Sequence, residues 1–257
     1  GGEPMVRPDI FDIVSFFRDN RIKTGIATNG TLLNEKNINR LVKSGIGYFE
    51  ISLPSVNQKI YSTLSQNDKT EKIRSAILLI KKYRIHLTVS FILTKINLNE
   101  LESVIDLCYV FSADSIALNR FVPGGYGLKN KNRLDITQKE LESALKIADQ
   151  KSAEYHIPIN ITIPIESCII DRNKYPHLNF SACVCGKYKW VIDPLGNLRT
   201  CEQNPEIIGN LFKDSFIELS SRKQAIDFLA NYVYKRCNKC PNLAFCGGGC
   251  KFLKCNR

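Results

Sequence analysis

Cysteines are the residues of this chain best suited to chemistry, and most of them lie near its C-terminal end. Eight of the ten fall within the last 75 residues. Thiols at such short spacings are typical of metal sites rather than of scattered core positions. We therefore expect this region to bind metal through Cys183, Cys185, Cys201, Cys237, Cys240, Cys246, Cys250 and Cys255.

Iron–sulfur clusters fit this spacing better than zinc. A zinc ribbon uses two Cys-x2-Cys pairs 15–20 residues apart, but here only Cys237 and Cys240 have that spacing and further cysteines follow closely. Such a run is more typical of ferredoxin-like ligation, although it differs from the bacterial pattern. Three consecutive glycines, 247–249, would let the backbone pass close to a cluster. Zinc stays open as the alternative.

The composition of the chain limits its fold class, its location and its partners. The 257 residues carry a net charge of +11 and are 44% hydrophobic, enough for one large α/β domain with a small appendage. The chain shows no signal peptide, so its many cysteines indicate reduced thiols rather than disulfides. No run approaches 18 apolar residues, so no membrane-spanning helix is expected. We therefore expect a cytoplasmic protein without membrane contact. The basic surface could attract an acidic partner, either a peptide or a nucleic acid, but a solvated lysine-rich surface is the simpler interpretation.

Strands and helices must alternate to position these groups. Apolar periodicity predicts strands over 22–28, 48–53, 85–93 and 115–121, and helices over 9–20, 34–44, 70–83, 98–111 and 137–156. Short connections between them call for a parallel sheet with right-handed crossovers. A part-barrel, a (β/α)6 TIM-like barrel without its first strand or strands, fits best, because polar and glycine-rich segments follow successive strands. A doubly wound sheet stays possible.

One strand has an unusual polar side. In residues 48–53, Tyr48, Glu50 and Ser52 share one face and apolar residues share the other. Strands of buried parallel sheets are usually apolar on both sides. We therefore expect this side to face a polar ligand, with a Glu50 paired to a buried Lys or Arg as the alternative.

The last third of the chain predicts a different kind of structure. A β-hairpin around Pro194–Asn197 should bring Cys183 and Cys185 close to Cys201, and a helix over 214–234 leads into the cysteine run. We interpret residues 1–165 as the part-barrel and 166–257 as a separate cysteine-rich domain. Cys108 lies on an apolar helical stripe and is interpreted as a core thiol, and Cys168 is interpreted as structural.

Taken in order, these motifs resemble the radical SAM enzymes that carry a SPASM or twitch C-terminal domain. Gly1, Gly2, Glu3 and Pro4 match the GGEP motif, and Thr28-Asn29-Gly30 matches the motif after the third barrel strand. Ile51-Ser52-Leu53 matches the fourth strand, and the segment 118–124 the sixth. The resemblance implies S-adenosylmethionine binding by Gly1, Gly2, Glu3, Pro4, Thr28, Asn29, Glu50, Ser52, Asn119 and Arg120.

The resemblance also divides the cysteines between two auxiliary [4Fe–4S] clusters. It implies that Cys183, Cys201 and Cys250 bind the first cluster, whose fourth ligand would be Cys185 or a substrate thiolate. The second cluster would then be bound by Cys237, Cys240, Cys246 and Cys255. Cys255 follows Cys250 more closely than is usual in the family, so the last ligand could instead lie beyond residue 257.

The family's catalytic cluster is bound by a Cys-x3-Cys-x2-Cys loop before GGEP, and these residues are absent from this chain. We therefore expect an N-terminally truncated enzyme that is inactive alone. The intact protein would cleave S-adenosylmethionine to a 5′-deoxyadenosyl radical and abstract hydrogen from a ribosomally made peptide or protein, to form thioether or carbon–carbon crosslinks or to oxidise a side chain. Expected partners are a substrate with an acidic leader and an electron donor such as flavodoxin or ferredoxin; no nucleic acid is expected. The alternatives are a non-catalytic iron–sulfur subunit that binds peptides or transfers electrons, and a zinc-stabilised scaffold.

Overall fold

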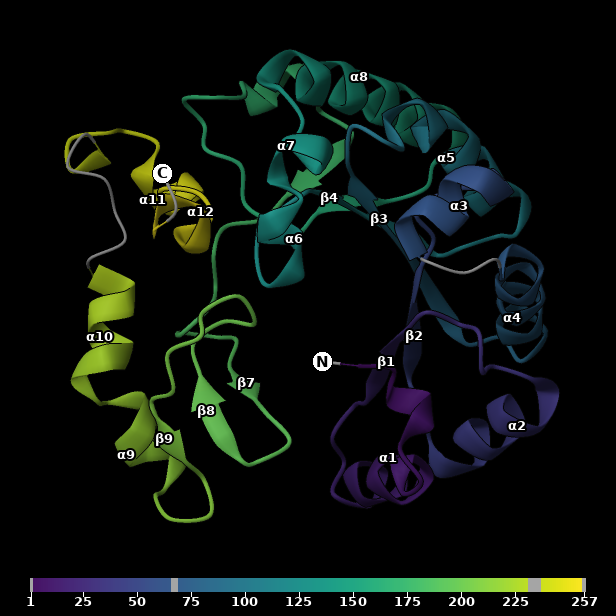
Figure 1. Ribbon diagram of the computed structural model, residues 1–257, viewed down its shortest axis with the longest axis horizontal. Coiled ribbons are helices and arrows are strands. Elements are labelled where there is room, and N and C mark those ends of the chain that lie inside the picture. Colours follow the sequence, from purple (N-terminus) through teal and green to yellow (C-terminus); the bar gives the residue numbers. More distant parts are fainter. Residues whose placement is uncertain (1, 66–68, 231–236, 256–257) are drawn as a thin grey trace.

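A curved parallel sheet forms the larger part of the molecule (Figure 1). The structure is a computed structural model, and it describes residues 2–65, 69–230 and 237–255. The sheet order is β1-β2-β3-β4-β5-β6, with every pair parallel. This consecutive order is that of a barrel segment and rules out the doubly wound alternative. The strands are β1 (Gly25–Thr28), β2 (Tyr48–Ser52), β3 (His86–Leu93), β4 (Ser115–Arg120), β5 (Ile159–Ile161) and β6 (Leu178–Phe180).

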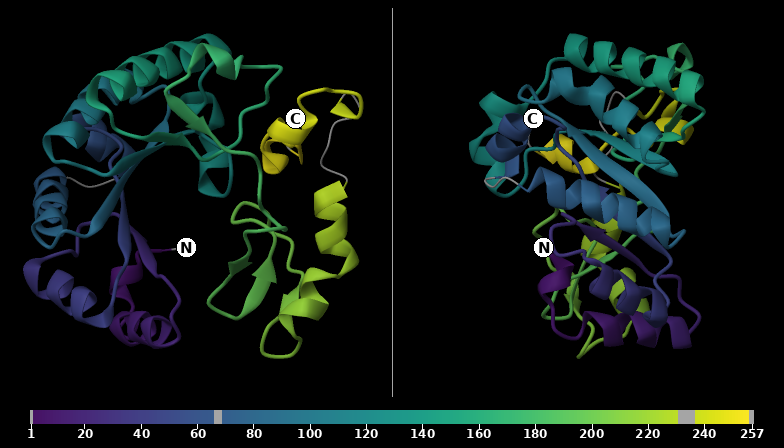
Figure 2. Two further views of the ribbon diagram at one scale, coloured as in Figure 1. Left: turned by 180° about the vertical axis from the view of Figure 1, so that it is seen from behind. Right: turned by 90° about the vertical axis from the view of Figure 1, so that its right-hand side faces the viewer.

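Helices cover the convex side of this sheet (Figure 2). The side chain of Asn34 caps α2, which ends at Gly45 with a φ of 91°, so the predicted glycine cap is confirmed. Thr137 and Glu140 form a capping box at the start of α8. The helical elements of this part are η1 (Pro4–Val6), α1 (Ile10–Asp19), α2 (Glu35–Ser44), α3 (Gln58–Ser65), α4 (Thr70–Lys82), η2 (Leu98–Glu100), α5 (Leu101–Val110), α6 (Tyr126–Lys129), α7 (Lys131–Leu134), α8 (Gln138–Tyr155) and η3 (Arg172–Lys174).

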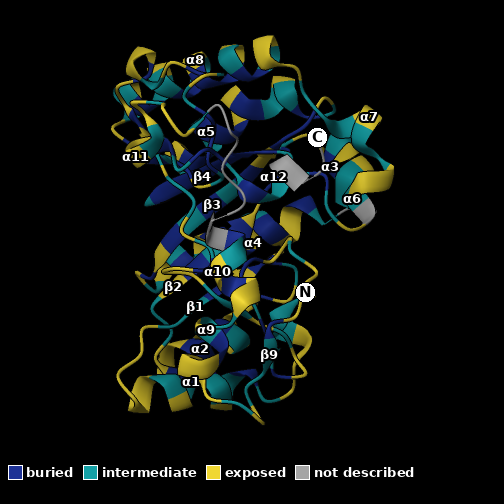
Figure 3. Cartoon of the chain, turned by 90° about the vertical axis from the view of Figure 1, so that its left-hand side faces the viewer, coloured by how far each residue is buried: buried dark blue, intermediate teal, exposed yellow. Residues whose placement is uncertain are grey.

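The core lies between the sheet and these helices. Phe49 and Ile51 of β2 are fully buried, as are Val89 and Phe91 of β3, and buried residues gather along the central strands (Figure 3). The opposite, concave side carries the polar residues of β2, in the alternation that the sequence predicts. The sheet therefore buries one face against helices and leaves the other free for a ligand.

The cysteine-rich part is smaller and lies opposite the concave side of the sheet (Figures 1 and 2). The predicted hairpin is confirmed as β7 (Val191–Ile192) and β8 (Asn197–Arg199), to which β9 (Gly209–Asn210) adds a third antiparallel strand. A separate small core contains Leu198, Ile208, Leu219 and Ala225. The helices here are α9 (Phe216–Ser220), α10 (Lys223–Ala230), α11 (Leu243–Cys246) and α12 (Lys251–Cys255).

Several elements differ from the prediction. The helix expected over 214–234 is divided into α9 and α10, because the Ser215 capping box begins a five-residue helix that ends before Arg222; residues 231–234 lie outside the described part. The sequence did not predict α3, which is weakly apolar, or β5 and β6, whose three residues are too few to show a period. The sheet continues to Phe180, while the domain boundary at 165 stays a prediction. No described helix is both long and apolar enough to span a membrane.

Candidate cofactor site and cysteine clusters

Glu3 joins the N-terminal turn to the carboxyl end of β1. One carboxylate oxygen of Glu3 accepts hydrogen bonds from the Thr28 hydroxyl at 2.6 Å and the Met5 N–H at 3.2 Å. The other oxygen accepts from the Asn29 N–H at 2.8 Å. The Gly30 N–H donates in turn to the Thr28 hydroxyl at 3.0 Å. The two sequence motifs therefore form one hydrogen-bonded unit, and Glu3 acts there as a positioning residue.

The other residues of the GGEP motif are Gly1, Gly2 and Pro4. Gly2 has open space where a side chain would lie, and Pro4 begins the turn η1, whose N-cap is Glu3. Gly1 lies outside the described residues. The backbone of this turn is therefore open to a ligand at Gly2, while Glu3 holds its far side.

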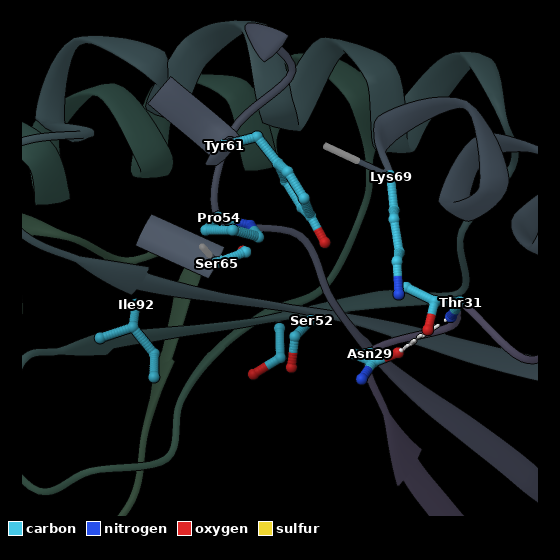
Figure 4. Close-up of a pocket in the computed structure, with 9 residues that line it drawn as sticks. Asn29, Thr31, Ser52, Pro54, Tyr61, Ser65, Lys69 and Ile92 are labelled. Carbon is cyan, nitrogen blue, oxygen red and sulfur yellow. Dashed lines mark hydrogen bonds between the residues drawn. The ribbon is translucent and has the colours of Figure 1, made fainter. Parts of the chain in front are cut away.

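A cavity of about 330 Å³ opens beside this unit on the concave side of the sheet. That volume is at the lower end of the range for small-molecule sites. The Asn29 side chain is fixed at its edge by accepting bonds from the N–H and hydroxyl of Thr31, at 2.9 and 2.7 Å (Figure 4). The lining residues are Asn29, Thr31, Ser52, Pro54, Tyr61, Ser65, Lys69, Ser90 and Ile92.

Tyr61 and Lys69 were not among the predicted site residues. Tyr61 comes from α3 and Lys69 precedes α4, and both side chains point toward the space over Ser52 (Figure 4). A hydroxyl and an ammonium here add hydrogen-bond donors suited to an anionic or polar ligand group. They were missed because the sequence did not predict α3, and a lone lysine near a helix start carries no specific signal.

Glu50 lies on the concave side, one row below Ser52. The register pairs Glu50 with Thr88 and Ser52 with Ser90, so polar residues are adjacent across β2 and β3. Within the described residues no hydrogen bond or ion pair engages the Glu50 carboxylate, so the buried Lys or Arg partner considered as the alternative is not found there. Glu50 does not line the cavity itself.

Asn119 and Arg120 at the end of β4 are engaged by the segment after β5. The Asn119 side-chain oxygen accepts from the Thr162 hydroxyl and the Ile163 N–H, at 3.0 and 2.7 Å. The Arg120 guanidinium donates to the Pro164 carbonyl at 2.8 Å and the Glu166 carboxylate at 2.9 Å. Neither Asn119 nor Arg120 lines the cavity beside Ser52. In this structure both residues connect β4 to the loop between β5 and β6, which also carries Cys168.

The first group of thiols contains Cys183, Cys185, Cys201 and Cys250. A hydrogen bond from Cys185 lowers the pKa of Cys183 to about 6 and also lowers that of Cys201, while the pKa of Cys185 is raised. The backbone N–H of Lys251 also stabilises the Cys183 thiolate. Cys250 precedes that lysine, and its pKa is raised by burial. The thiolate form that binds metal is therefore favoured at Cys183 and Cys201, whereas Cys185 and Cys250 are held toward the thiol form.

The donors of this group fit an iron–sulfur cluster. In the described part, Cys185, Cys201 and Glu202 form the single set whose ligand atoms all lie within 4.8 Å of one another. The Glu202 carboxylate is paired with Lys189 and accepts a hydrogen bond from the Cys201 thiol, so the other two ligands of the set are sulfur atoms. An all-sulfur donor set is the one that iron–sulfur clusters use.

The second group contains Cys237, Cys240 and Cys246, which line a cavity of about 30 Å³ together with Cys168. Burial raises the pKa of Cys246, but hydrogen bonds from Ser167 outweigh this and hold it below the ordinary value. The Ser167 N–H lies 3.4 Å from the Cys246 sulfur. Cys255 belongs to α12, but its side chain lies outside the described residues.

A parallel part-barrel with a polar concave side, followed by two groups of thiols, defines a cofactor-binding protein with metal centres. Residues 1–108 match the model of the radical SAM superfamily, and residues 183–241 match that of the SPASM iron–sulfur cluster-binding domain. The two matches together assign the first part of the chain to the radical SAM superfamily and the later part to the SPASM domain, as its motifs led us to expect.

Curated relatives share part of the chain. The PqqA peptide cyclase of Granulibacter bethesdensis is 26% identical over 152 residues, which are 58% of this chain and 40% of the cyclase. The probable GTP 3′,8-cyclase of Methanococcus vannielii is 35% identical over 57% of this chain and 48% of its own. That of Sulfurisphaera tokodaii is 29% identical over 80% of this chain and 66% of its own. The chain thus spans between two fifths and two thirds of these relatives.

Solved structures support the fold over nearly the whole chain. The structure described as native anSMEcpe with bound AdoMet and Kp18Cys peptide has a TM-score of 0.76 at 19% identity, covering 98% of this chain and 74% of that one. Streptococcus suis SuiB bound to S-adenosylmethionine has a TM-score of 0.75 at 18% identity, covering 97% and 60%. The predicted part-barrel with a small cysteine-rich domain is therefore confirmed.

Proposed function

We propose that this chain acts in a radical S-adenosylmethionine enzyme that modifies a ribosomally made peptide or protein by hydrogen abstraction, with two auxiliary iron–sulfur clusters. The observation that carries the proposal is the cavity at the carboxyl ends of β1–β3, on the side of the sheet that faces the SPASM domain (Figure 1). A cofactor there would lie between the sheet and the clusters. A radical formed there would be shielded by both parts of the chain.

Residues of the cavity and its border have distinct roles in this proposal. Glu3 holds the turn at Gly2 and Pro4 against Thr28 and Asn29, so that the turn's backbone can receive the amino group of S-adenosylmethionine. The Ser52 hydroxyl would bond the ribose of the cofactor, and Glu50 below it would accept a further hydrogen bond. Bound S-adenosylmethionine supplies the hydrogen-abstracting chemistry, and the protein supplies orientation and exclusion of water.

A peptide substrate is favoured over a nucleotide. Relatives include a PqqA peptide cyclase as well as probable GTP 3′,8-cyclases. The structural neighbours that cover at least 97% of this chain include anSMEcpe with a bound peptide and SuiB bound to its precursor peptide SuiA. The chain's net charge of +11 would also favour an acidic leader segment on the substrate. Reduction of the clusters would require an electron donor such as flavodoxin or ferredoxin.

Cofactor binding tests the site directly. Equilibrium dialysis of the chain with S-adenosylmethionine should show about tenfold weaker binding for Ser52→Ala, because one hydrogen bond in a partly enclosed site contributes about 1.4 kcal/mol. Thr63→Ala removes an exposed hydroxyl on α3 outside the cavity and should leave the affinity unchanged. Equal affinity in all three proteins would contradict the assignment of this cavity.

The substrate class is tested with the protein expressed from its gene, assayed under reducing, anaerobic conditions. Peptides encoded beside the gene and GTP would be offered separately, and 5′-deoxyadenosine and substrate mass would be measured. Release of 5′-deoxyadenosine with a mass change in a peptide supports the proposal. Turnover with GTP alone would replace the peptide assignment, and cluster assembly with no 5′-deoxyadenosine would favour the non-catalytic iron–sulfur subunit.

A further inference from the structure

We propose that Cys168 is a ligand of the second auxiliary cluster, together with Cys237, Cys240 and Cys246. The inference rests on the proposed iron–sulfur content of the SPASM domain. The sequence interpretation treated Cys168 as structural and gave the fourth position to Cys255. Cys168 lies outside the cysteine-rich run and outside the residues 183–241 that match the SPASM model.

The four thiols meet at one place. Cys168, Cys237, Cys240 and Cys246 line the same small cavity, and none of them is in a disulfide. The other lining residues are Glu166, Ser167, Leu243 and Gly248. Three of the four cysteines come from one short segment, and Cys168 is brought to them by the loop after β5. Four cysteines around one small space are the donor set that a cubane cluster takes.

Burial in a core does not explain the cysteine at position 168. It is exposed, whereas Cys108 is only 2% exposed within the apolar core of the part-barrel. A core thiol contributes by packing, and burial raises the pKa of Cys108 to about 12, which keeps it protonated. An exposed thiol contributes little packing, so a ligand function accounts better for Cys168.

The part-barrel fixes one side of the loop that carries Cys168. Arg120 donates to the Pro164 carbonyl and to the Glu166 carboxylate, and the side chains of this ion pair are only 8% and 4% exposed. Arg172 donates to the Ile165 carbonyl at 2.6 Å. The Glu166 carbonyl accepts from the N–H of Ile169 and Ile170, which closes a turn around Cys168. The loop is therefore held in place from the sheet side before any metal binds.

The cysteine run contacts the other side of the same loop. The Ser167 N–H donates to the Cys246 sulfur, one residue before Cys168. Gly249, with a φ of 81°, lies so close that a Cβ atom there would be 2.5 Å from the Glu166 side chain. Only glycine permits this approach without a shift of the loop. The loop therefore packs closely against residues 246–249, and this contact places Cys168 beside the second group of thiols.

The proposed step is simple ligation. The Cys168 thiol loses its proton to solvent and its sulfur bonds to an iron of the cluster, with no change of oxidation state. In a cubane each thiolate binds a different iron, so these four sulfur atoms need not come as close as ligands of one ion do.

Alkylation of the thiols gives a readout that is independent of activity. Iodoacetamide should modify Cys168 readily in the metal-free chain, since the side chain is exposed, and at least tenfold more slowly after anaerobic reconstitution with iron and sulfide. Cys108 is the internal control and should react slowly in both states because it is buried. Peptide mapping by mass spectrometry measures both sites. Equal modification of Cys168 before and after reconstitution would overturn the proposal.

Alanine variants distinguish Cys168 from Cys255, the other candidate for the fourth ligand of the second cluster. Cys168→Ala should lose between one and four of about eight irons per chain, with a changed electron paramagnetic resonance spectrum, while Cys108→Ala and Cys255→Ala should retain them. If Cys255→Ala loses iron while Cys168→Ala retains all of it, the assignment of Cys168 is overturned and the proposed function still stands. A wild-type chain that binds zinc and no sulfide would overturn the proposed function as well.

Discussion

The sheet and the cysteine-rich domain are stabilised in different ways. In the sheet region Glu3, Thr28 and Asn29 satisfy one another by hydrogen bonds, and a large apolar core lies behind them. In the described part of the cysteine-rich domain, the small core contains Leu198, Ile208, Leu219 and Ala225, and the thiols form two separate groups. The proposed cofactor site is therefore organised by the chain's own hydrogen bonds, whereas we expect the thiol sites to be completed by metal.

Removal of the clusters should produce the largest difference between the two regions. We expect amide hydrogen exchange in residues 183–250 to accelerate about a thousandfold, equivalent to about 4 kcal/mol, because a structural metal centre contributes folding free energy directly. Exchange in β2, β3 and β4 should change little. Exchange mapped by mass spectrometry before and after chelation measures this. Equal loss of protection in both regions would contradict the independent stability of the sheet.

The Arg120–Glu166 ion pair should be the next most sensitive point, because it is buried and holds the β5–β6 loop that contacts Cys246 of the cysteine-rich domain. Glu166→Gln leaves the guanidinium without its charged partner and should destabilise the protein by about 3 kcal/mol in denaturant unfolding. The double variant Arg120→Met with Glu166→Leu removes both charges and should recover much of the loss. A double variant as unstable as the single one would show that packing, rather than charge, is what the pair provides.

Acid should weaken the sheet region by a smaller amount through Asp114. Burial raises the pKa of Asp114, but hydrogen bonds from Lys81 and the Leu87 N–H outweigh it and hold the pKa below the ordinary value. The stabilisation is therefore complete above the unfolded-state pKa, about 4, and is lost as the pH falls through the lower folded-state pKa.

Asp114→Asn should accordingly cost about 1 kcal/mol at pH 7 and less at pH 3, as measured by denaturant midpoints at both values. Glu206→Gln changes an exposed carboxylate of the cysteine-rich domain; it is the matched control and should be neutral at both pH values. A constant difference for Asp114→Asn across this range would show that ionisation of the aspartate is not the cause.

The sequence predicted most of the sheet because its signals are local. Alternation in 48–53, the apolar period of 70–83 and the glycine that ends α2 each act over a few residues, and the structure confirms all three. The hairpin between Cys185 and Cys201 was equally visible, because Pro194 and Gly196 mark its turn. Motif order then indicated the family, which the family models confirm.

The rest depends on contacts between distant residues. Cys168 lies beside Cys246 only because Arg120 and Gly249 hold its loop from two sides. Tyr61 reaches the cavity beside Ser52 from a helix whose sequence is weakly apolar. Arg120 matched the family pattern, yet its guanidinium bonds Glu166 instead of lining the cavity. Spacing alone carries no signal for any of these contacts.

The most direct test is a metal and sulfide analysis of the anaerobically reconstituted wild-type chain. The account predicts about eight irons and eight sulfides per chain with no zinc, which corresponds to two [4Fe–4S] clusters. One zinc per chain and no acid-labile sulfide would contradict it, and would leave the thiols as a structural site.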